Sequence, residues 1–203
     1  MYVYLARHGE TLWNRQGKTQ GAKDIPLTEC GIRQAEVLGE RLEGEGISKI
    51  YSSGLMRAFQ TASIIGNKLN LYAEKRHELN EINFGIWEGL TRQKIDTDYP
   101  GQLEAYRSDF EFAPNDGENL KSLQFRIQRF LDSLINKYGD TDKKILLVAH
   151  AYPIRMLIME IMGLPKELLW RYQLSNSGIS VIRIESESPY LLCLNDTTHM
   201  CKT

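Results

Sequence analysis

The chain has 203 residues, a formal net charge of −1 at pH 7, and 42% hydrophobic and 25% charged residues. This length favours a single domain, which we expect to span residues 1–203, and the composition is that of a globular protein able to bury a full core. The charge balance argues against a general nucleic-acid-binding protein, because such proteins carry a basic excess. A small anionic ligand remains compatible with it, since a pocket needs only local positive charge.

The cysteines and apolar runs predict a cytoplasmic protein. Cys30, Cys193 and Cys201 are odd in number and form no C-x-x-C pair, which is typical of a reduced intracellular set rather than of a disulfide framework or a zinc site. The apolar run at the amino terminus is too short for the core of a signal peptide. No other apolar stretch approaches the roughly 20 residues of a membrane span, so we expect no membrane partner.

The first half of the chain alternates apolar strand patterns with helical patterns. Residues 2–6 are apolar and typical of a buried strand, and a long loop follows them. Thr28 is the expected N-cap of a helix that buries one face. The residues of that face are Ile32, Ala35, Leu38 and Leu42. A strand at 47–53, a helix at 55–69 and a third strand at 72–79 complete this half.

The second half begins with an irregular segment at 81–117, rich in aromatic residues, for which short helices are expected. Residues 118–138 predict an amphipathic helix, because apolar residues recur there every three or four positions. These are Leu120, Leu123, Ile127, Phe130 or Leu131, and Leu134. Residues 144–149 are apolar on both faces, as in a central parallel strand. A helix at 153–163 and two strands near the sheet edge, at 179–185 and 190–195, follow. The alternation predicts an α/β layer fold with a mostly parallel sheet.

Polar side chains with chemical potential follow the predicted strands. Arg7 and His8 follow the first strand, Glu81 the third, and His150 the strand at 144–149. Ser52 and Ser53 end the second strand. Ligands of parallel α/β sheets bind beyond the carboxyl ends of the strands, so we expect these residues to meet at one rim.

Two arginines, Arg7 and Arg57, beside two histidines indicate a phosphate site. Guanidinium groups bind phosphate oxygens in bidentate fashion, and they disfavour the protonation of a nearby imidazole. A neutral His8 is then free to attack phosphorus and form a phosphohistidine, while the arginines and His150 hold the phosphate oxygens. Glu81 is the candidate that protonates the leaving oxygen and then deprotonates the attacking water.

Four segments carry a family resemblance: LARHGETLWN, YSSGLMRAFQTA, ELNEINFGIWEG and LLVAHAYPIR. In this order they resemble the four signature blocks of the histidine phosphatase superfamily, which is the phosphoglycerate mutase-like or RHG-motif family. The resemblance extends over nearly the whole chain. It implies a three-layer α/β/α sandwich, mostly parallel with one antiparallel strand, and an enzyme that needs neither a metal nor a cofactor.

The resemblance also implies roles for single residues. His8 takes the position of the phosphorylated histidine, and Glu81 that of the acid–base carboxylate. The implied binding residues for phosphate and substrate are Arg7, Asn14, Gln20, Gly21, Arg57, His150 and Ala151. Most aromatic residues near these blocks are expected in the core, namely Trp13, Phe84, Trp87, Tyr106, Phe110 and Phe112. Residues 81–117 take the place of the family's cap, so one or two of the aromatic residues within this segment are expected to line the pocket.

The chain departs from the family pattern after its second histidine. Glycine is usual there, whereas this chain has Ala151 followed by Tyr152. A β-carbon and a phenol at these positions are expected to narrow the pocket and restrict the leaving group.

These patterns predict a metal-independent phosphomonoester hydrolase acting on small phosphorylated metabolites. A zinc site built from His8, His150 and Glu81 is the chemical rival, but Arg7 and Arg57 would oppose a cation there. The functional alternatives are a cofactor-dependent phosphoglycerate mutase, which shares the same core, and a non-catalytic phosphate-binding regulatory relative. A homodimer is a further expectation, and the sequence names no individual substrate.

Overall fold

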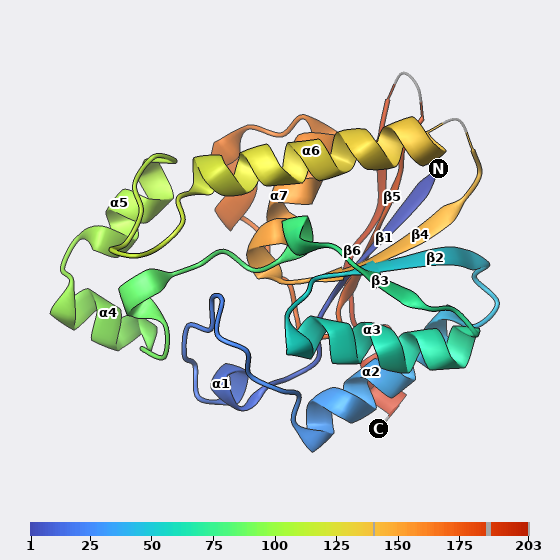
Figure 1. Ribbon diagram of the computed structural model, residues 1–203, viewed down its shortest axis with the longest axis horizontal. Coiled ribbons are helices and arrows are strands. Elements are labelled where there is room, and N and C mark those ends of the chain that lie inside the picture. Colours follow the sequence, from blue (N-terminus) through green and yellow to red (C-terminus); the bar gives the residue numbers. More distant parts are fainter. Residues whose placement is uncertain (140, 186–187, 203) are drawn as a thin grey trace.

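A computed structural model describes residues 1–139, 141–185 and 188–202 and contains a six-stranded sheet in the order β3-β2-β4-β1-β5-β6 (Figure 1). The strands are β1 (Tyr2–Arg7), β2 (Ile47–Ser52), β3 (Ala73–Lys75), β4 (Lys144–Ala149), β5 (Ile179–Arg183) and β6 (Tyr190–Asp196). Strands β1 to β4 pair in parallel. Strand β5 runs antiparallel to both neighbours, so it alone in this sheet is reversed, as the family resemblance implies.

Helices cover both faces of the sheet and make a three-layer sandwich. They are α1 (Leu12–Arg15), α2 (Glu29–Leu42), α3 (Met56–Leu69), α4 (Arg92–Asp98), α5 (Gln102–Ser108), α6 (Leu120–Tyr138) and α7 (Ala151–Met162). Figure 1 shows α6 and α7 on one face and α2 and α3 on the other. The expected α/β/α fold is confirmed. None of the described helices has the length and apolar character that crossing a bilayer requires.

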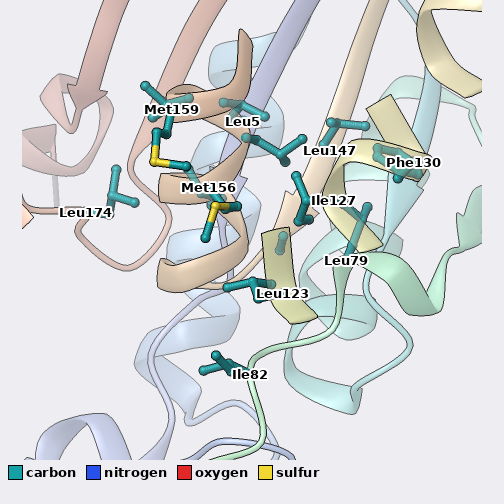
Figure 2. Packing of buried hydrophobic residues seen from close by; sticks show 14 of the residues in the cluster. Leu5, Leu79, Ile82, Leu123, Ile127, Phe130, Leu147, Met156, Met159 and Leu174 are labelled. Carbon is teal, nitrogen blue, oxygen red and sulfur yellow. The ribbon is translucent and has the colours of Figure 1, made fainter. Parts of the chain in front are cut away.

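The central strands are buried on both faces because their side chains alternate between two cores. In β1, Val3 and Leu5 enter the core beneath α6 and α7, while Tyr4 and Ala6 enter the core beneath α2 and α3. Figure 2 shows Leu5 in the first core. This explains why the sequence of β1 and of β4 is apolar throughout rather than alternating.

The helix α6 confirms the predicted periodicity. All six of its inward apolar residues are buried: Leu120, Leu123, Ile127, Phe130, Leu131 and Leu134. Each such burial contributes about 1.5–3 kcal/mol, so this stripe fixes α6 on the sheet. Asn119 caps the helix, because its side chain accepts a hydrogen bond from the backbone N–H of Ser122 at 2.8 Å.

Two expectations about the first half of the chain are corrected. Thr28 does cap α2, but Ile32 is 40% exposed, and Gly31 is buried instead. The reason is that α2 meets the loop after β1 backbone to backbone, and a β-carbon on Gly31 would collide with the carbonyl of Glu10.

The strand expected over 72–79 is also shorter than predicted. Strand β3 ends at Lys75, and a 3₁₀ turn, His77–Leu79, follows it. This bend carries Leu79 into the core beneath α6, where the side chain is fully buried (Figure 2). Burial of Leu79 therefore outweighs the local β-propensity of the segment.

The remaining elements surround the carboxyl ends of the strands. The loop after β1 carries the short helix α1, and the 81–117 segment contains the 3₁₀ turn Gly85–Trp87 followed by α4 and α5. Both segments lie at the same end of the sheet in Figure 1. The short helices expected in 81–117 are present, and α7 begins at Ala151, two residues before the predicted start. Two further 3₁₀ segments are Lys166–Trp170, which follows α7, and Thr198–Lys202, which follows β6.

Candidate active site

A cavity of about 190 Å³ lies between the first loop, the 81–117 segment and the start of α7. Its lining residues are Arg7, His8, Asn14, Lys18, Thr19, Gln20, Gly21, Arg57, Glu81, Phe84, Trp87, Ala151 and Tyr152. Every predicted site residue except His150 is in this set. A larger hollow of about 720 Å³ lies beside α6 and α7, and of the predicted residues only the aromatic candidate Phe110 lines it. The site residues predicted at the strand ends therefore meet at one cavity, apart from His150.

His8 is held in one tautomer. Its Nδ1 lies 2.7 Å from the carbonyl oxygen of Gly9. A carbonyl only accepts hydrogen bonds, so Nδ1 carries the proton and Nε2 keeps its lone pair. Burial lowers the pKa of His8 well below its usual range, and the charges of Arg57 and Arg7 lower it further. The imidazole is therefore neutral at pH 7, with Nε2 as its free basic nitrogen.

Gly9 is required by close packing. The residue does not have a positive φ. A β-carbon at Gly9 would collide with the carbonyl of Gly31 in α2. Gly9 and Gly31 let the loop after β1 lie directly on α2, and this close packing fixes the position of His8 at the cavity.

Backbone carbonyl groups orient the side chains of Arg7 and Arg57. Arg57 donates to the carbonyls of Lys23 at 2.7 Å and Gly21 at 2.8 Å. Arg7 donates through Nη1 to the carbonyl of Leu174 at 2.6 Å, while its buried Nε has no hydrogen-bond partner among the described residues. Burial lowers the pKa of Arg7 to about 10, so the group stays charged at pH 7. Two fixed cations thus border His8, and one keeps a free donor.

His150 lies behind the cavity wall. Its ring centroid is 5.0 Å from that of His8. Arg57 Nε donates to His150 Nδ1 at 3.2 Å, and because a guanidinium only donates, the proton of His150 sits on Nε2. That proton is directed at the hydroxyl of Ser53, 2.8 Å away, and Ser53 donates to Oδ1 of Asn80 at 2.9 Å.

This relay fixes the ring of His150 and the plane of Arg57 together. Burial lowers the pKa of His150 well below its usual range, and Arg57 adds to the effect. Both ring nitrogens are bonded to protein groups in this state. The contact of His150 with phosphate stays a prediction.

Glu81 has the opposite proton preference. Burial raises the pKa of its carboxyl group, although Arg57 and the backbone N–H of Ile82 act in the lowering direction. Its Oε1 accepts that N–H at 3.0 Å. A carboxyl group whose pKa is raised holds its proton at a higher pH than an ordinary glutamic acid and suits general-acid chemistry.

The side-chain amides of Asn14 and Gln20 are oriented by their oxygens. Asn14 Oδ1 accepts from the backbone N–H of Thr11 at 3.0 Å and from Asn176 at 3.2 Å. The hydroxyl of Thr11 lies 2.9 Å from Oε1 of Gln20. Because the oxygens are engaged by protein donors, the amide nitrogens remain to donate to a bound ligand.

Gly21 lies where the first loop crosses the 81–117 segment. Its φ of +56° is unfavourable for other residues, and a β-carbon there would collide with the carboxylate of Glu88. That carboxylate accepts the backbone N–H groups of Ala22 at 2.7 Å and Phe84 at 3.1 Å. Glu88 therefore links the first loop to the 81–117 segment through hydrogen bonds. Glu78 and Glu74 differ from it, because they form ion pairs with Arg76 and Lys49 respectively.

The part of the cavity wall that the 81–117 segment forms is aromatic. Phe84 and Trp87 line the cavity, as expected for one or two residues of this region, and the other candidates do not. Ala151 and Tyr152 both border the cavity, so the departure from the family pattern at Ala151 and the phenol beside it form part of its wall. They form the first turn of α7, whose free N–H groups and dipole favour a negative charge.

Several features of the site have no signal in the sequence. Ser53 is expected only as the end of a strand, and Asn80, Lys18 and Thr19 belong to no recognised pattern. Ser53 and Asn80 form the hydrogen-bonded chain to His150, and Lys18 and Thr19 line the cavity. Within residues 1–139, 141–185 and 188–202, no three His, Cys, Asp or Glu side chains are arranged to hold a metal ion.

Comparisons with known proteins agree with this geometry. The family model "Histidine phosphatase superfamily (branch 1)" matches residues 3–197. Phosphoserine phosphatase 1 of Hydrogenobacter thermophilus is 31% identical, with 98% of this chain and 93% of that protein covered. A probable phosphoglycerate mutase of Yersinia pestis is 35% identical, with 98% and 95% covered.

A solved structure is similarly close. A mycobacterial glucosyl-3-phosphoglycerate phosphatase in complex with VO3 superposes with a TM-score of 0.89 at 30% identity, and the match covers 97% of this chain and 99% of that one. With the family model spanning nearly all of the chain, the protein belongs to the histidine phosphatase superfamily and is a phosphoric monoester hydrolase.

Proposed function

We propose that the protein hydrolyses phosphate monoesters of small metabolites through a phosphohistidine formed at Nε2 of His8. The observation that carries this proposal is the 2.7 Å hydrogen bond from His8 Nδ1 to the Gly9 carbonyl, which leaves the lone pair on Nε2. A neutral nucleophile beside the guanidinium groups of Arg7 and Arg57 is suited to attack on a phosphate dianion.

In the first step Nε2 of His8 forms a bond to phosphorus and the ester P–O bond breaks. Arg7 and Arg57 hold the non-bridging oxygens while charge shifts toward the leaving oxygen. Glu81 gives its proton to that oxygen, so that the product leaves as a neutral alcohol. Asn14 and Gln20 donate their amide N–H groups to the phosphate, and the backbone of Gly21 keeps Arg57 in place.

In the second step the carboxylate of Glu81 takes a proton from water, and the resulting hydroxide attacks phosphorus. The P–N bond breaks, inorganic phosphate is released, and His8 returns to its neutral form. No metal enters this scheme, because Arg7 and Arg57 supply the positive charge that a cation would otherwise provide.

The substrate we propose is a small ester. A cavity of about 190 Å³ has room for a phosphate and a short alcohol. The names of the relatives support the broader class of metabolite phosphate monoesters, since they refer to phosphoserine, glucosyl-3-phosphoglycerate and α-ribazole phosphate. The name of the Yersinia relative favours mutase activity as the second candidate.

Product analysis separates these candidates. We expect the purified protein to release inorganic phosphate from monophosphoglycerate and from an aryl phosphate, and to do so equally in EDTA. Rapid isomerisation of monophosphoglycerate with little phosphate would establish the mutase. Activity lost to EDTA and restored by a divalent ion would contradict the two-arginine mechanism, and no turnover of either ester would favour a phosphate-binding regulator.

The expectations about cellular context stay predictions. We propose a cytoplasmic protein whose partners are phosphate esters rather than nucleic acid or membrane, and which forms a homodimer. Sedimentation of the purified protein measures the last of these directly.

A further inference from the structure

Tyr152 is held rigidly in the cavity wall, although the mechanism above gives it no role. Its ring makes T-shaped contacts with Phe84 at 5.0 Å and Trp170 at 5.5 Å between centroids. The guanidinium of Arg155 lies 5.9 Å from the ring centroid. These contacts fix both side-chain torsions, so the hydroxyl group has a defined position.

The hydroxyl group of Tyr152 makes no hydrogen bond to any described residue. The phenols nearby differ in this respect: Tyr172 donates to the carbonyl of Arg155 at 3.2 Å, and Tyr106 lies 3.5 Å from that of Glu118. Burial raises the pKa of Tyr152 to about 12, so its hydroxyl keeps the proton and is a donor. A tyrosine hydroxyl normally finds a partner when it is enclosed, and here the cavity is where one can bind.

Two more donors without acceptors belong to the same cavity. Lys18, on the first loop, forms no ion pair with any described carboxylate, and its ammonium lies 5.9 Å from the ring centroid of Trp13. The indole N–H of Trp87 is buried without a hydrogen-bond partner among the described residues. Arg7 and Arg57 already serve the phosphate, so these donors remain for another part of the ligand.

Glu81 is the acidic side chain of the cavity lining, and the proposed mechanism occupies it with proton transfer. The remaining wall therefore offers donors and a positive charge without a matching acceptor. An alcohol that consists of hydrocarbon alone would leave these groups unsatisfied, at a cost to binding. An alcohol with a carboxylate would satisfy both the phenol and the ammonium.

We propose that Tyr152 determines specificity, and that its hydroxyl donates a hydrogen bond to a carboxylate on the alcohol part of the substrate beside the ammonium of Lys18. This inference rests on the proposed function, since it concerns the alcohol of the ester that His8 attacks. It assigns a chemical role to the phenol beside Ala151, the position at which the chain departs from the family pattern.

The test uses three esters of equal chain length: 3-(phosphonooxy)propanoate, its amide and n-propyl phosphate. The readout is the ratio of kcat/KM for the carboxylate ester to kcat/KM for n-propyl phosphate. We expect the Tyr152→Phe variant, which keeps the ring and its packing, to lower this ratio about tenfold or more, because a hydrogen bond to a charged acceptor is lost. Lys18→Met should lower the same ratio and leave the amide-to-propyl ratio nearly unchanged.

Inhibition by inorganic phosphate is the control, because it reports the Arg7 and Arg57 site and should stay within twofold in both variants. An equal loss of kcat/KM for all three esters in Tyr152→Phe would show a structural role and overturn the inference. A kcat/KM ratio of carboxylate ester to n-propyl phosphate near one in the unmodified protein would also overturn the inference. Hydrolysis of an aryl phosphate by the same protein would then show that the proposed function itself still holds. Absence of any turnover would overturn both.

Discussion

His8 and Glu81 have opposite proton preferences, although His8 is buried and Glu81 half-buried at the same cavity. Burial disfavours the charged form of each side chain, so it lowers the pKa of the imidazole and raises that of the carboxyl group. The neutral forms of both residues are the forms that the first chemical step needs. One physical cause thus prepares the nucleophile and the general acid together.

The pH profile should follow from these directions. Hydrolysis of an alkyl phosphate needs neutral His8, which exists above its lowered pKa, and protonated Glu81, which exists below its raised pKa. We therefore expect kcat/KM to fall on the alkaline side at a pH above the usual glutamate range. Glu81→Gln should remove that limb and lower the rate for the alkyl ester about 10²–10⁴-fold. For an aryl phosphate, whose leaving group departs without a proton, the first step should change far less.

The matched control for this prediction is Glu78→Gln. Glu78 belongs to the same acidic block, but it pairs with Arg76 and does not line the cavity. Its variant should keep the profile of the unmodified protein. If Glu81→Gln hydrolysed alkyl and aryl esters at unchanged rates, Glu81 would have no part in proton transfer.

The site depends on two loops that cross at Gly21. The carbonyl of this residue accepts a hydrogen bond from Arg57, and its Cα faces the carboxylate of Glu88. We expect Gly21→Ala to displace the loop and disorient Arg57, because the added methyl group has no space. Its kcat/KM should fall about tenfold or more, since Arg57 then loses its aim at the transition state.

Gly17→Ala is the control for backbone strain. Gly17 lies in the same loop with a φ of +64°, but a β-carbon there meets no atom within 4 Å. Both variants should lose about 1–2 kcal/mol of stability from the left-handed backbone, measured by urea unfolding. Activity should decline only in Gly21→Ala. Equal activity in the two variants would show that the crossing does not position Arg57.

At the same scale, the sequence predicts those elements whose signals are local. The period of α6 and the Thr28 cap of α2 are both written in neighbouring residues. The exposure of Ile32 and the early end of β3 cannot be predicted in this way, because each results from a contact with a distant segment. Ile32 is exposed because its neighbour Gly31 packs against Glu10, and β3 ends early because Leu79 enters the core beneath α6.

Across the whole molecule, the residues predicted from the strand ends and the four motif blocks lie at one cavity, with His150 directly behind it. Sequence reasoning misses the groups that orient them, because these come from remote parts of the chain. Leu174 supplies the carbonyl for Arg7, and Ser53 and Asn80 bind His150. Such partners carry no motif of their own, since a backbone carbonyl or a small polar residue serves equally in many sequences.

The proposed mechanism depends on a covalent intermediate at His8. Removing Glu81 should slow the second step by removing the base for water, while an aryl phosphate still completes the first step. The decisive measurement is therefore the intact mass of Glu81→Ala after mixing with an aryl phosphate, with the double variant Glu81→Ala, His8→Ala treated in parallel. We expect one acid-labile phosphoryl group on Glu81→Ala and none on the double variant. The same phosphoryl gain in both proteins, or none in either while hydrolysis continues, would contradict it.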